Sequence, residues 1–563
     1  MRERESPLAF PLRHFYALGI MEKLPVFSLA SQLGIPAEMV EPYGRDKGKI
    51  ALEALDSGKK PGKMILVSAI TPTPAGEGKT TTSIGLAQGM KLIGKSVALA
   101  LRQPSMGPVF GRKGGATGGG KSTVQPATEI NLQFTGDFHA ITAAHNLLAA
   151  AIDNKLYFRN TRLDTRRITW KRVIDMNDRS LRHIVVGCNG NGVPRESGFD
   201  ITVASEIMAI LCLAENYEDL RARLNKMVVG FDAENKPVFA EEIGVTGSLM
   251  AILKEALKPN LVSSVEGVPA FVHGGPFANI AQGCNSVIAT KMAMNYADYA
   301  ITEAGFAFDL GGEKFFDIKC RSAGIAPDAV VIVATIRALK MHGGKGLKEL
   351  TETDVAAVER GLENLGAHID SAKKFGRPIV VALNKFPTDT PEEFAAVEQF
   401  CAAQGVPAAY AGSFAEGGPG CTELAKLVCE ACEKPSPEFK PLYSLDVPVA
   451  EKLETIAKEM YGADGVVILP KAQKKLESLA LAGGDKMMIC MAKTQNSLSD
   501  DPTKLGRPKG FKITVRDFEI AAGAGFLVAL TGDIMRMPAL PKVPCAESID
   551  LDAEGNITGM LGV

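Results

Sequence analysis

The sequence predicts an α/β protein built on a doubly wound, mostly parallel sheet, with two smaller α/β or α+β domains. Short, almost continuously apolar runs alternate with helical patterns; these runs cover residues 64–67, 96–101, 299–303, 329–334 and 379–383. Runs of this length and composition are typical of strands that are buried on both faces. A glycine-rich turn joins the first run to a helical pattern, as expected where a parallel strand passes into its crossover helix.

The length of the chain predicts more than one domain. A chain of 563 residues is too long for a single hydrophobic core. We expect a nucleotide-binding domain over residues 1–365, a smaller α/β domain over 366–450 and a C-terminal domain over 451–563. Within the first of these, residues 1–60 have a helical pattern that is interrupted by turn signals at 34–36 and 42–44.

The composition excludes several classes of partner. The chain is 46% hydrophobic and 23% charged, and its formal net charge is -1, which favours neither nucleic acid nor an anionic membrane surface. No apolar run approaches the roughly 18 residues of a membrane-spanning helix, and no long apolar segment follows the charged first residues. Ten cysteines without a repeating spacing are typical of a reducing compartment. We therefore expect a cytoplasmic protein with no nucleic-acid or membrane partner.

Residues 70–83, ITPTPAGEGKTTTS, follow the first apolar run and have the features of a phosphate-binding loop. Gly76 and Gly78 allow the backbone to turn tightly and to direct its N–H groups at phosphate oxygens. Lys79 supplies a cation near the β- and γ-phosphates, and Thr80 offers a hydroxyl group to Mg²⁺. The N-terminus of the following helix adds partial positive charge. A glycine-rich strand–helix turn without a ligand is the alternative interpretation.

The loop predicts a P-loop NTPase-like fold and a set of nucleotide-binding residues. These are Thr73, Pro74, Ala75, Gly76, Glu77, Gly78, Lys79, Thr80 and Thr81. Thr73 stands where the first glycine of the pattern GxxxxGK[ST] is expected. Further along the chain, the segment NKFPTD resembles the guanine-reading NKxD pattern, but Pro387 replaces its aspartate. The sequence therefore favours ATP over GTP.

Basic residues follow the second apolar run. Arg102 comes directly after this run, at the strand end where doubly wound sheets bind ligands, so we expect it to bind an anion rather than to be a simple surface charge. The next segment, residues 105–122, is rich in glycine and includes Arg112, Lys113 and Lys121. We interpret it as a loop that approaches an anionic ligand closely; a flexible linker is the alternative.

Two further features concern acidic residues. Asp137 begins a helical pattern at the position expected for its N-cap. Asp309, Glu313, Lys314 and Asp317 form a dense charged cluster among apolar residues. The cluster is compatible with a solvated helix face as well as with a functional site.

Taken together, these segments resemble the formate–tetrahydrofolate ligases, also called formyltetrahydrofolate synthetases, in their monofunctional form. The resemblance extends along the whole chain and rests on EPYG, TPAGEGKTTT, LRQPSMGPVFG, NLQFTGDFHAI, ITWKRVIDMNDR, HGGPFANIA, EKFFDIKCR, NKFPTDT and MAKTQNSLSDDP. It implies that formate, ATP and tetrahydrofolate give 10-formyltetrahydrofolate, ADP and phosphate through formyl phosphate. It also suggests a homotetramer, Mg²⁺ bound with ATP, a possible monovalent cation and no tightly bound organic cofactor.

The resemblance also implies roles for individual residues. Lys79 and Arg102 would be catalytic, with Arg102 holding formyl phosphate and its developing charge. Two aromatic rings sandwich the pterin in the family, and Phe386 and Phe414 stand at the matching places. Asp137 is assigned to the same folate site.

This sequence departs from the family pattern near the expected ligands. Phe414 replaces the usual tryptophan, and Gln103 stands where a carboxylate is frequent, which brings activation by a monovalent cation into question. Phe308 replaces a small residue and is expected to take up room beside Phe414, and Asn496 replaces a tyrosine. Two alternatives follow: a paralogue that retains acyl-phosphate chemistry but uses another acceptor, and a P-loop switch NTPase that acts through a protein partner.

Overall fold

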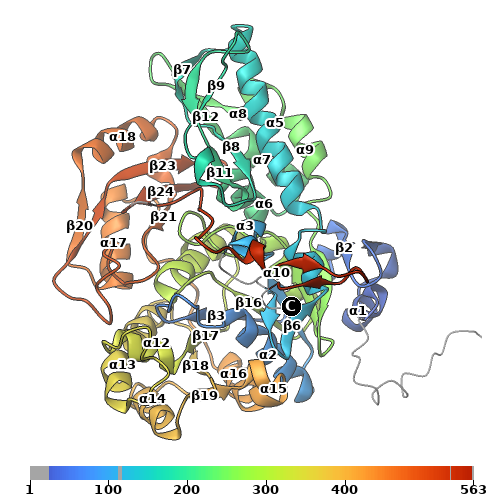
Figure 1. Cartoon of the computed structure of the whole chain (residues 1–563), viewed down its shortest axis with the longest axis vertical. Coiled ribbons are helices and arrows are strands. Elements are labelled where there is room, and N and C mark those ends of the chain that lie inside the picture. The colour runs from blue at the N-terminus through green and yellow to red at the C-terminus, as the bar shows by residue number, and fades with distance from the viewer. Residues whose placement is uncertain (1–23, 112–116, 533, 561–563) are drawn as a thin grey trace, which may run out of the picture.

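The computed structural model describes residues 24–111, 117–532 and 534–560, and a large mixed sheet runs through its middle (Figure 1). Seven neighbouring strands of this sheet are parallel, in the order β15 (Pro269–Val272), β4 (Val97–Leu101), β16 (Tyr299–Glu303), β3 (Lys63–Ala69), β17 (Ala329–Ala334), β18 (Ile379–Asn384) and β19 (Ala408–Ala411). Antiparallel strands extend the β15 edge: β14 (Asn260–Ser264), β2 (Gly48–Ile50), β1 (Val40–Pro42), β6 (Ser122–Gln125) and β5 (Gly118–Gly119). The predicted mostly parallel α/β sheet is confirmed.

Both faces of the parallel strands are covered, which is why the strands are apolar throughout. Ile65 and Val67 of β3 share a core with α2 (Lys79–Leu92) and α16 (Thr422–Glu433). Met64 and Leu66 point to the other face and share a core with α12 (Ile336–His342) and α13 (Val355–Lys373). Two more helices accompany the sheet, α10 (Val287–Tyr296) and α14 (Pro391–Ala403). This double covering is the doubly wound arrangement that the sequence predicts.

Residues 137–253, which lie between the second and third parallel strands along the chain, form a separate layer, seen at the top of Figure 1. Its helices are α5 (Asp137–Tyr157), α6 (Glu206–Leu213), α7 (Tyr217–Asn225), α8 (Ala240–Ile243) and α9 (Thr246–Leu253). Its strands are β7 (Leu163–Ile168), β12 (Val228–Asp232) and β13 (Pro237–Phe239), with the pairs β8 (Arg172–Ile174) and β11 (Phe199–Ile201), and β9 (Ile184–Val186) and β10 (Arg195–Ser197).

The C-terminal part lies beside both of these regions, at the left of Figure 1. It contains α17 (Val449–Tyr461), α18 (Pro470–Ala480), the parallel pair β20 (Gly465–Ile468) and β22 (Lys512–Val515), and a sheet of β21 (Met488–Ala492), β24 (Phe526–Leu530) and β23 (Asp517–Ala521). A last hairpin joins β25 (Asp550–Leu551) to β26 (Ile557–Thr558). Strands β18 and β19, from the range 366–450, continue the main sheet; the division into three domains stays a prediction.

Two predictions about local structure are wrong. In the described part of residues 1–60 the only α-helix is α1 (Val26–Leu33), and strands β1 and β2 follow it, because the proline and glycine residues from 34 to 48 interrupt the helical pattern. The N-cap of α5 is Gly136, at φ 85°, and Asp137 is the first helical residue. The Asp137 carboxylate binds Lys49 and Asn260 instead of the helix backbone.

The charged cluster of residues 309–317 is not a solvated helix face. Asp309, Glu313, Lys314 and Asp317 are all buried in a segment of two π-helical turns, η5 (Phe308–Gly312) and η6 (Phe315–Cys320). A π-helical turn is wider than an α-helical one and is frequent at functional sites. Among the helices of the described ranges, none is long and apolar enough to cross a membrane.

Candidate functional site

The predicted phosphate loop joins β3 to α2 at the C-terminal edge of the parallel strands. Gly78, at φ 72°, is the N-cap of α2, and Gly76 has φ 83°. Both are left-handed conformations that glycine adopts without steric cost. The Thr73 N–H group donates to Glu77 Oε1 at 2.7 Å, and the Gly76 N–H group donates to the carbonyl oxygen of Thr73 at 2.9 Å. The loop is therefore closed on itself before any ligand binds.

Glu77 holds the loop from the inside. Its side chain is fully buried and accepts hydrogen bonds from Thr73 N and from the Thr335 hydroxyl, at the end of β17. Asn384, the last residue of β18, donates from Nδ2 to the Glu77 carbonyl oxygen at 3.0 Å. Burial raises the pKa of Glu77, and the hydrogen bonds from Thr335 and Thr73 oppose that shift. The ends of two neighbouring strands thus fix the backbone that would surround a phosphate.

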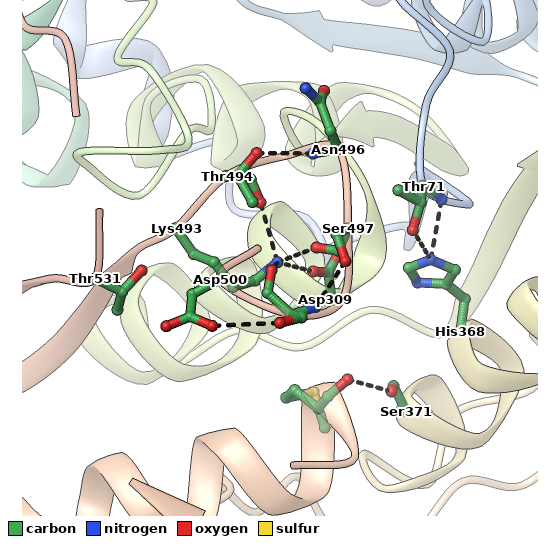
Figure 2. Close-up of polar contacts among 12 residues, drawn as sticks. Thr71, Asp309, His368, Ser371, Lys493, Thr494, Asn496, Ser497, Asp500 and Thr531 are labelled. Carbon is green, nitrogen blue, oxygen red and sulfur yellow. Dashed lines mark hydrogen bonds and ion pairs between the residues drawn. The ribbon is translucent and has the colours of Figure 1, made fainter. Parts of the chain in front are cut away.

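Two buried histidines fix the start of the loop at Thr71. The neutral His368 ring accepts from the Thr71 N–H group at Nε2, 3.0 Å away (Figure 2), and burial lowers the pKa of this ring to about 4. His342 donates from Nε2 to the Thr71 carbonyl oxygen at 2.9 Å, and its Nδ1 accepts from the N–H group of Gly506. The C-terminal part of the chain therefore supports the loop through one histidine ring.

A buried carboxylate that the sequence reasoning missed lies beside the loop. Glu303 is the last residue of β16, the strand between β3 and β4, and its Oε2 accepts from the Thr80 hydroxyl at 2.8 Å. Its other oxygen lies 3.6 Å from Nη2 of Arg102. The sequence held one signal for Glu303: it ends an apolar run, just as Arg102 follows another. The topology brings the ends of all three strands together.

This cluster has polar atoms left over for a ligand. Within the described structure, Glu303 Oε1 and Arg102 Nε are buried and have no hydrogen-bond partner. An unpartnered guanidinium N–H group suits an anion, as predicted for Arg102. The Thr80 hydroxyl and the Glu303 carboxylate are the hard oxygen donors that Mg²⁺ prefers. These residues therefore fit a magnesium ion that arrives with a nucleotide.

The two predicted folate-binding rings follow neighbouring strands. Phe386 comes two residues after β18 and Phe414 three residues after β19, within α15 (Ser413–Glu416). The guanidinium of Arg337 covers one face of Phe386, with 4.2 Å from its carbon to the ring centroid. The Phe414 side chain is 61% exposed, which leaves a large apolar surface in solvent.

The glycine-rich segment packs directly against Phe414. A Cβ at Gly119 would lie 3.2 Å from the Phe414 ring, and one at Gly120 would lie 2.1 Å from its carbonyl oxygen. The Lys121 N–H group donates to that carbonyl oxygen at 2.9 Å. The structure thus joins two segments that the sequence singled out separately. Arg112 and Lys113, in the same segment, lie outside the described residues.

The structure places two of the residues that depart from the family pattern, Phe308 and Asn496, and the expectation for Phe308 is wrong. Phe308 does not fill space beside Phe414: it is fully buried and its ring contacts Phe316 and Phe375, because the π-helical turn directs it into the core. Asn496 is exposed, and its N–H group donates to the Thr494 hydroxyl beside the buried pair of Lys493 and Asp309 (Figure 2).

Two further predicted residues, Asp137 and Gln103, are buried and hydrogen-bonded within the protein. Asp137 binds Lys49 through one oxygen and Asn260 through the other, at 2.6 Å for the latter. Gln103 and the Thr135 hydroxyl contact each other at 2.7 Å and 2.9 Å, through both ends of the amide group. Because this amide is neutral, it does not fit the role of a charged ligand for a monovalent cation. In the ranges that the structure describes, no group of three or more His, Cys, Asp and Glu side chains could hold a metal ion.

One comparison with known proteins bears on this arrangement. A family model described as "Formate--tetrahydrofolate ligase" matches residues 19–561, which is essentially the whole chain. The family comprises ATP-dependent ligases that act on formate and tetrahydrofolate.

The closed geometry of the loop predicts that residue 78 tolerates no side chain. In Gly78→Ala the new Cβ would lie 2.5 Å from Asn384 Nδ2, at a φ that costs alanine about 1–3 kcal/mol. We expect at least a roughly tenfold loss of ATP affinity, measured by titration calorimetry, because the loop must move off the end of β18.

Gly94→Ala is the matched control. Gly94 has φ 80° and no atom within 4 Å of its Cβ position, and it follows the far end of α2. This variant should lose thermal stability but retain ATP affinity. Wild-type ATP affinity in Gly78→Ala would contradict the proposed role of the loop geometry.

Proposed function

The chain belongs to the formate–tetrahydrofolate ligase family, and on this premise we propose that it ligates formate to tetrahydrofolate through a formyl phosphate intermediate, with ATP as the phosphoryl donor. The observation that carries this proposal is the set of unpartnered buried atoms at the strand ends. Arg102 Nε and Glu303 Oε1 have no hydrogen-bond partner in the described structure, and Thr80 at the start of α2 lies beside them. This arrangement supports an anion on the guanidinium and a phosphate–magnesium group on the loop.

In the first step, formate attacks the γ-phosphorus of ATP and displaces ADP, which gives formyl phosphate. Formate itself is a poor acyl donor, because its oxygen leaves poorly until it is phosphorylated. Phosphoryl transfer depends mainly on in-line positioning and charge neutralisation. Lys79 and the loop N–H groups would bind the β- and γ-phosphates, and Arg102 would orient formate and stabilise the growing charge. When bound, Mg²⁺ would be held by Thr80 and Glu303 and would neutralise phosphate charge.

In the second step, N10 of tetrahydrofolate attacks the formyl carbon, phosphate leaves, and N10 loses its proton. Phe386 and Phe414 would hold the pterin between them. Phe386 has Arg337 on one face, so we assign its other face to the pterin. The exposed ring of Phe414 supports a role in binding an aromatic ligand. Asp137 would contribute indirectly, since both of its oxygens are engaged within the protein.

Two alternatives differ from the proposed ligase, one in the acceptor that it uses and the other in its need for a protein partner. A paralogue with another acceptor would retain the loop, Arg102 and Glu303 but would not need two rings at Phe386 and Phe414. A P-loop switch NTPase would hydrolyse ATP in response to a protein partner. ATP turnover that depends on tetrahydrofolate, with no protein partner present, distinguishes the ligase from the switch. We further propose a cytoplasmic homo-oligomer, a tetramer as the family suggests, with neither nucleic acid nor membrane as partner.

The first prediction tests the function itself. Wild-type protein supplied with formate, ATP and tetrahydrofolate should form 10-formyltetrahydrofolate, measured by absorbance after acid conversion to the methenyl form. Lys79→Ala should lower this rate at least about 100-fold, because a donor to the transferring phosphate is removed. Lys95→Ala changes an exposed lysine just after the same helix and should have the wild-type rate. Full activity of Lys79→Ala would refute the phosphate-loop assignment.

The second prediction concerns the pterin. Phe414→Ala should raise KM for tetrahydrofolate roughly five- to 150-fold, because loss of one stacking face costs about 1–3 kcal/mol. The KM for ATP should stay nearly constant. Phe158→Ala is the control, since Phe158 is 68% exposed and follows the distant end of α5. If Phe414→Ala leaves folate kinetics untouched, the paralogue with another acceptor becomes the better hypothesis.

The third prediction concerns monovalent cations. Because Gln103 is neutral and its amide is engaged by Thr135, K⁺ should stimulate the initial rate only slightly when it replaces a large organic cation at constant ionic strength. A several-fold stimulation by K⁺ that Gln103→Ala abolishes would show that the neutral side chain suffices to bind the cation.

A further inference from the structure

Two buried lysines in the π-helical segment have no role in the mechanism above. Lys314 and Lys319 belong to the segment EKFFDIKCR and are both fully buried. Within the described structure, no carboxylate lies within ion-pair distance of either ammonium group. Burying a lysine without a carboxylate is costly unless hydrogen bonds satisfy its donors, so the partners of these two groups are informative.

Both lysines bind the same loop. Lys314 Nζ donates to the carbonyl oxygen of Ala278. Lys319 Nζ donates to the carbonyl oxygen of Asn285 at 3.0 Å, to its side-chain oxygen at 2.8 Å and to the Thr290 hydroxyl at 2.7 Å. The two ammonium groups therefore hold the two ends of the loop over residues 278–285, which lies between β15 and α10.

Gly305 lies beside both this loop and the guanidinium of Arg102. A Cβ at Gly305 would lie 2.8 Å from Arg102 Nη1 and 2.7 Å from the methyl group of Ala278. A Cβ at Gly283 would lie 2.2 Å from the same methyl group, and the Gly305 N–H group donates to the Gly283 carbonyl oxygen at 2.9 Å. The wall beside Arg102 thus leaves no room for one added methyl group. A small shift of Ala278 would change the space around the guanidinium.

The two ammonium groups also add positive charge near Arg102. The buried thiol of Cys284 lies near these groups, and its pKa depends on them. Burial raises its pKa to about 11, while Lys319, Arg102 and Lys314 lower it and Glu303 raises it. Both lysines and Arg102 therefore lie near the same buried thiol.

We propose that Lys314 and Lys319 are positioning residues for the anion of Arg102: they hold the 278–285 loop against the guanidinium and so set the affinity for formate and its acyl phosphate without touching either. This inference rests on the proposed function, because it takes formate as the anion at Arg102. It assigns to the buried motif EKFFDIKCR a task in substrate binding.

The test is a kinetic comparison of Lys314→Met with wild type. Loss of the hydrogen bond to Ala278 should displace the loop and raise KM for formate roughly tenfold or more, while KM for ATP stays within about twofold. An effect through general instability would instead change both constants, or neither. An unchanged KM for formate in folded Lys314→Met, or an equal rise in both constants, overturns the proposal.

Lys452→Met is the matched control. Lys452 is also fully buried and donates to two carbonyl oxygens, of Asp485 and Met487 at 2.8 Å and 3.1 Å, in the C-terminal part. Its replacement should lower the temperature of unfolding without changing the formate constant. The same rise in KM for formate in Lys452→Met would overturn the proposal, because the loss of a buried lysine elsewhere in the protein would then have the same effect.

If Lys314→Met does not fold, a milder variant still tests the proposal. Thr290→Val removes one of the three acceptors of Lys319 and keeps the branched shape, so KM for formate should rise roughly two- to fivefold. No rise in folded Thr290→Val would refute the role of Lys319. Failure of the proposed function is separate: wild-type protein would then form no 10-formyltetrahydrofolate, whereas failure of this inference leaves wild-type activity intact.

Discussion

The conformation of the predicted phosphate loop depends on one buried carboxylate. Glu77 is removed from solvent and binds the Thr73 N–H group and the Thr335 hydroxyl, so it ties both sides of the loop to the end of β17. Burying a carboxylate without hydrogen-bond partners would cost free energy. The loop therefore keeps the conformation in which Glu77 reaches Thr73 and Thr335. Asn384 adds the end of β18 by binding the Glu77 carbonyl oxygen. The loop is therefore preorganised, which would limit the loss of conformational entropy if it binds a phosphate as proposed.

The parallel sheet places the remaining groups by topology alone. Strand β16 lies between β3 and β4, so Glu303 at its end necessarily lies between the loop and Arg102. Strands β18 and β19 continue along the same edge, which brings Phe386 and Phe414 to neighbouring positions. The proposed order of ligands, from acyl phosphate through nucleotide phosphate to pterin, follows the order of the strands.

Three buried lysines stabilise loops of the structure through hydrogen bonds. Lys314, Lys319 and Lys493 are all fully buried and bind backbone carbonyl oxygens of loops near the strand ends. Lys493 additionally pairs with Asp309 at 3.1 Å, which ties the C-terminal part to the π-helical segment (Figure 2). Such contacts are directional, unlike apolar packing, and they specify one loop conformation at a cost in desolvation.

The sequence by itself determined the parallel strands and the tight turn between β3 and α2, because both are local. The predicted runs 299–303 and 329–334 coincide with β16 and β17, and the glycines at 76 and 78 have the left-handed conformations that the motif requires. Local hydrophobicity and turn chemistry suffice for such features. Arg102 could also be named from its place at a strand end, and Lys79 and Thr80 from the loop motif. Phe386 and Phe414 were named from the family resemblance.

Only the tertiary structure decided which of the charged residues are buried. The spacing of Asp309, Glu313 and Lys314 is equally compatible with a solvated helix face. Their burial depends on partners that are distant in sequence, such as Lys493 for Asp309. The role of Glu303 depends on strand order, which no local pattern contains. Likewise, Phe308 enters the core and not the Phe414 site because a π-helical turn rotates it inward. Burial and strand order are properties of the whole chain, so a local pattern leaves them open.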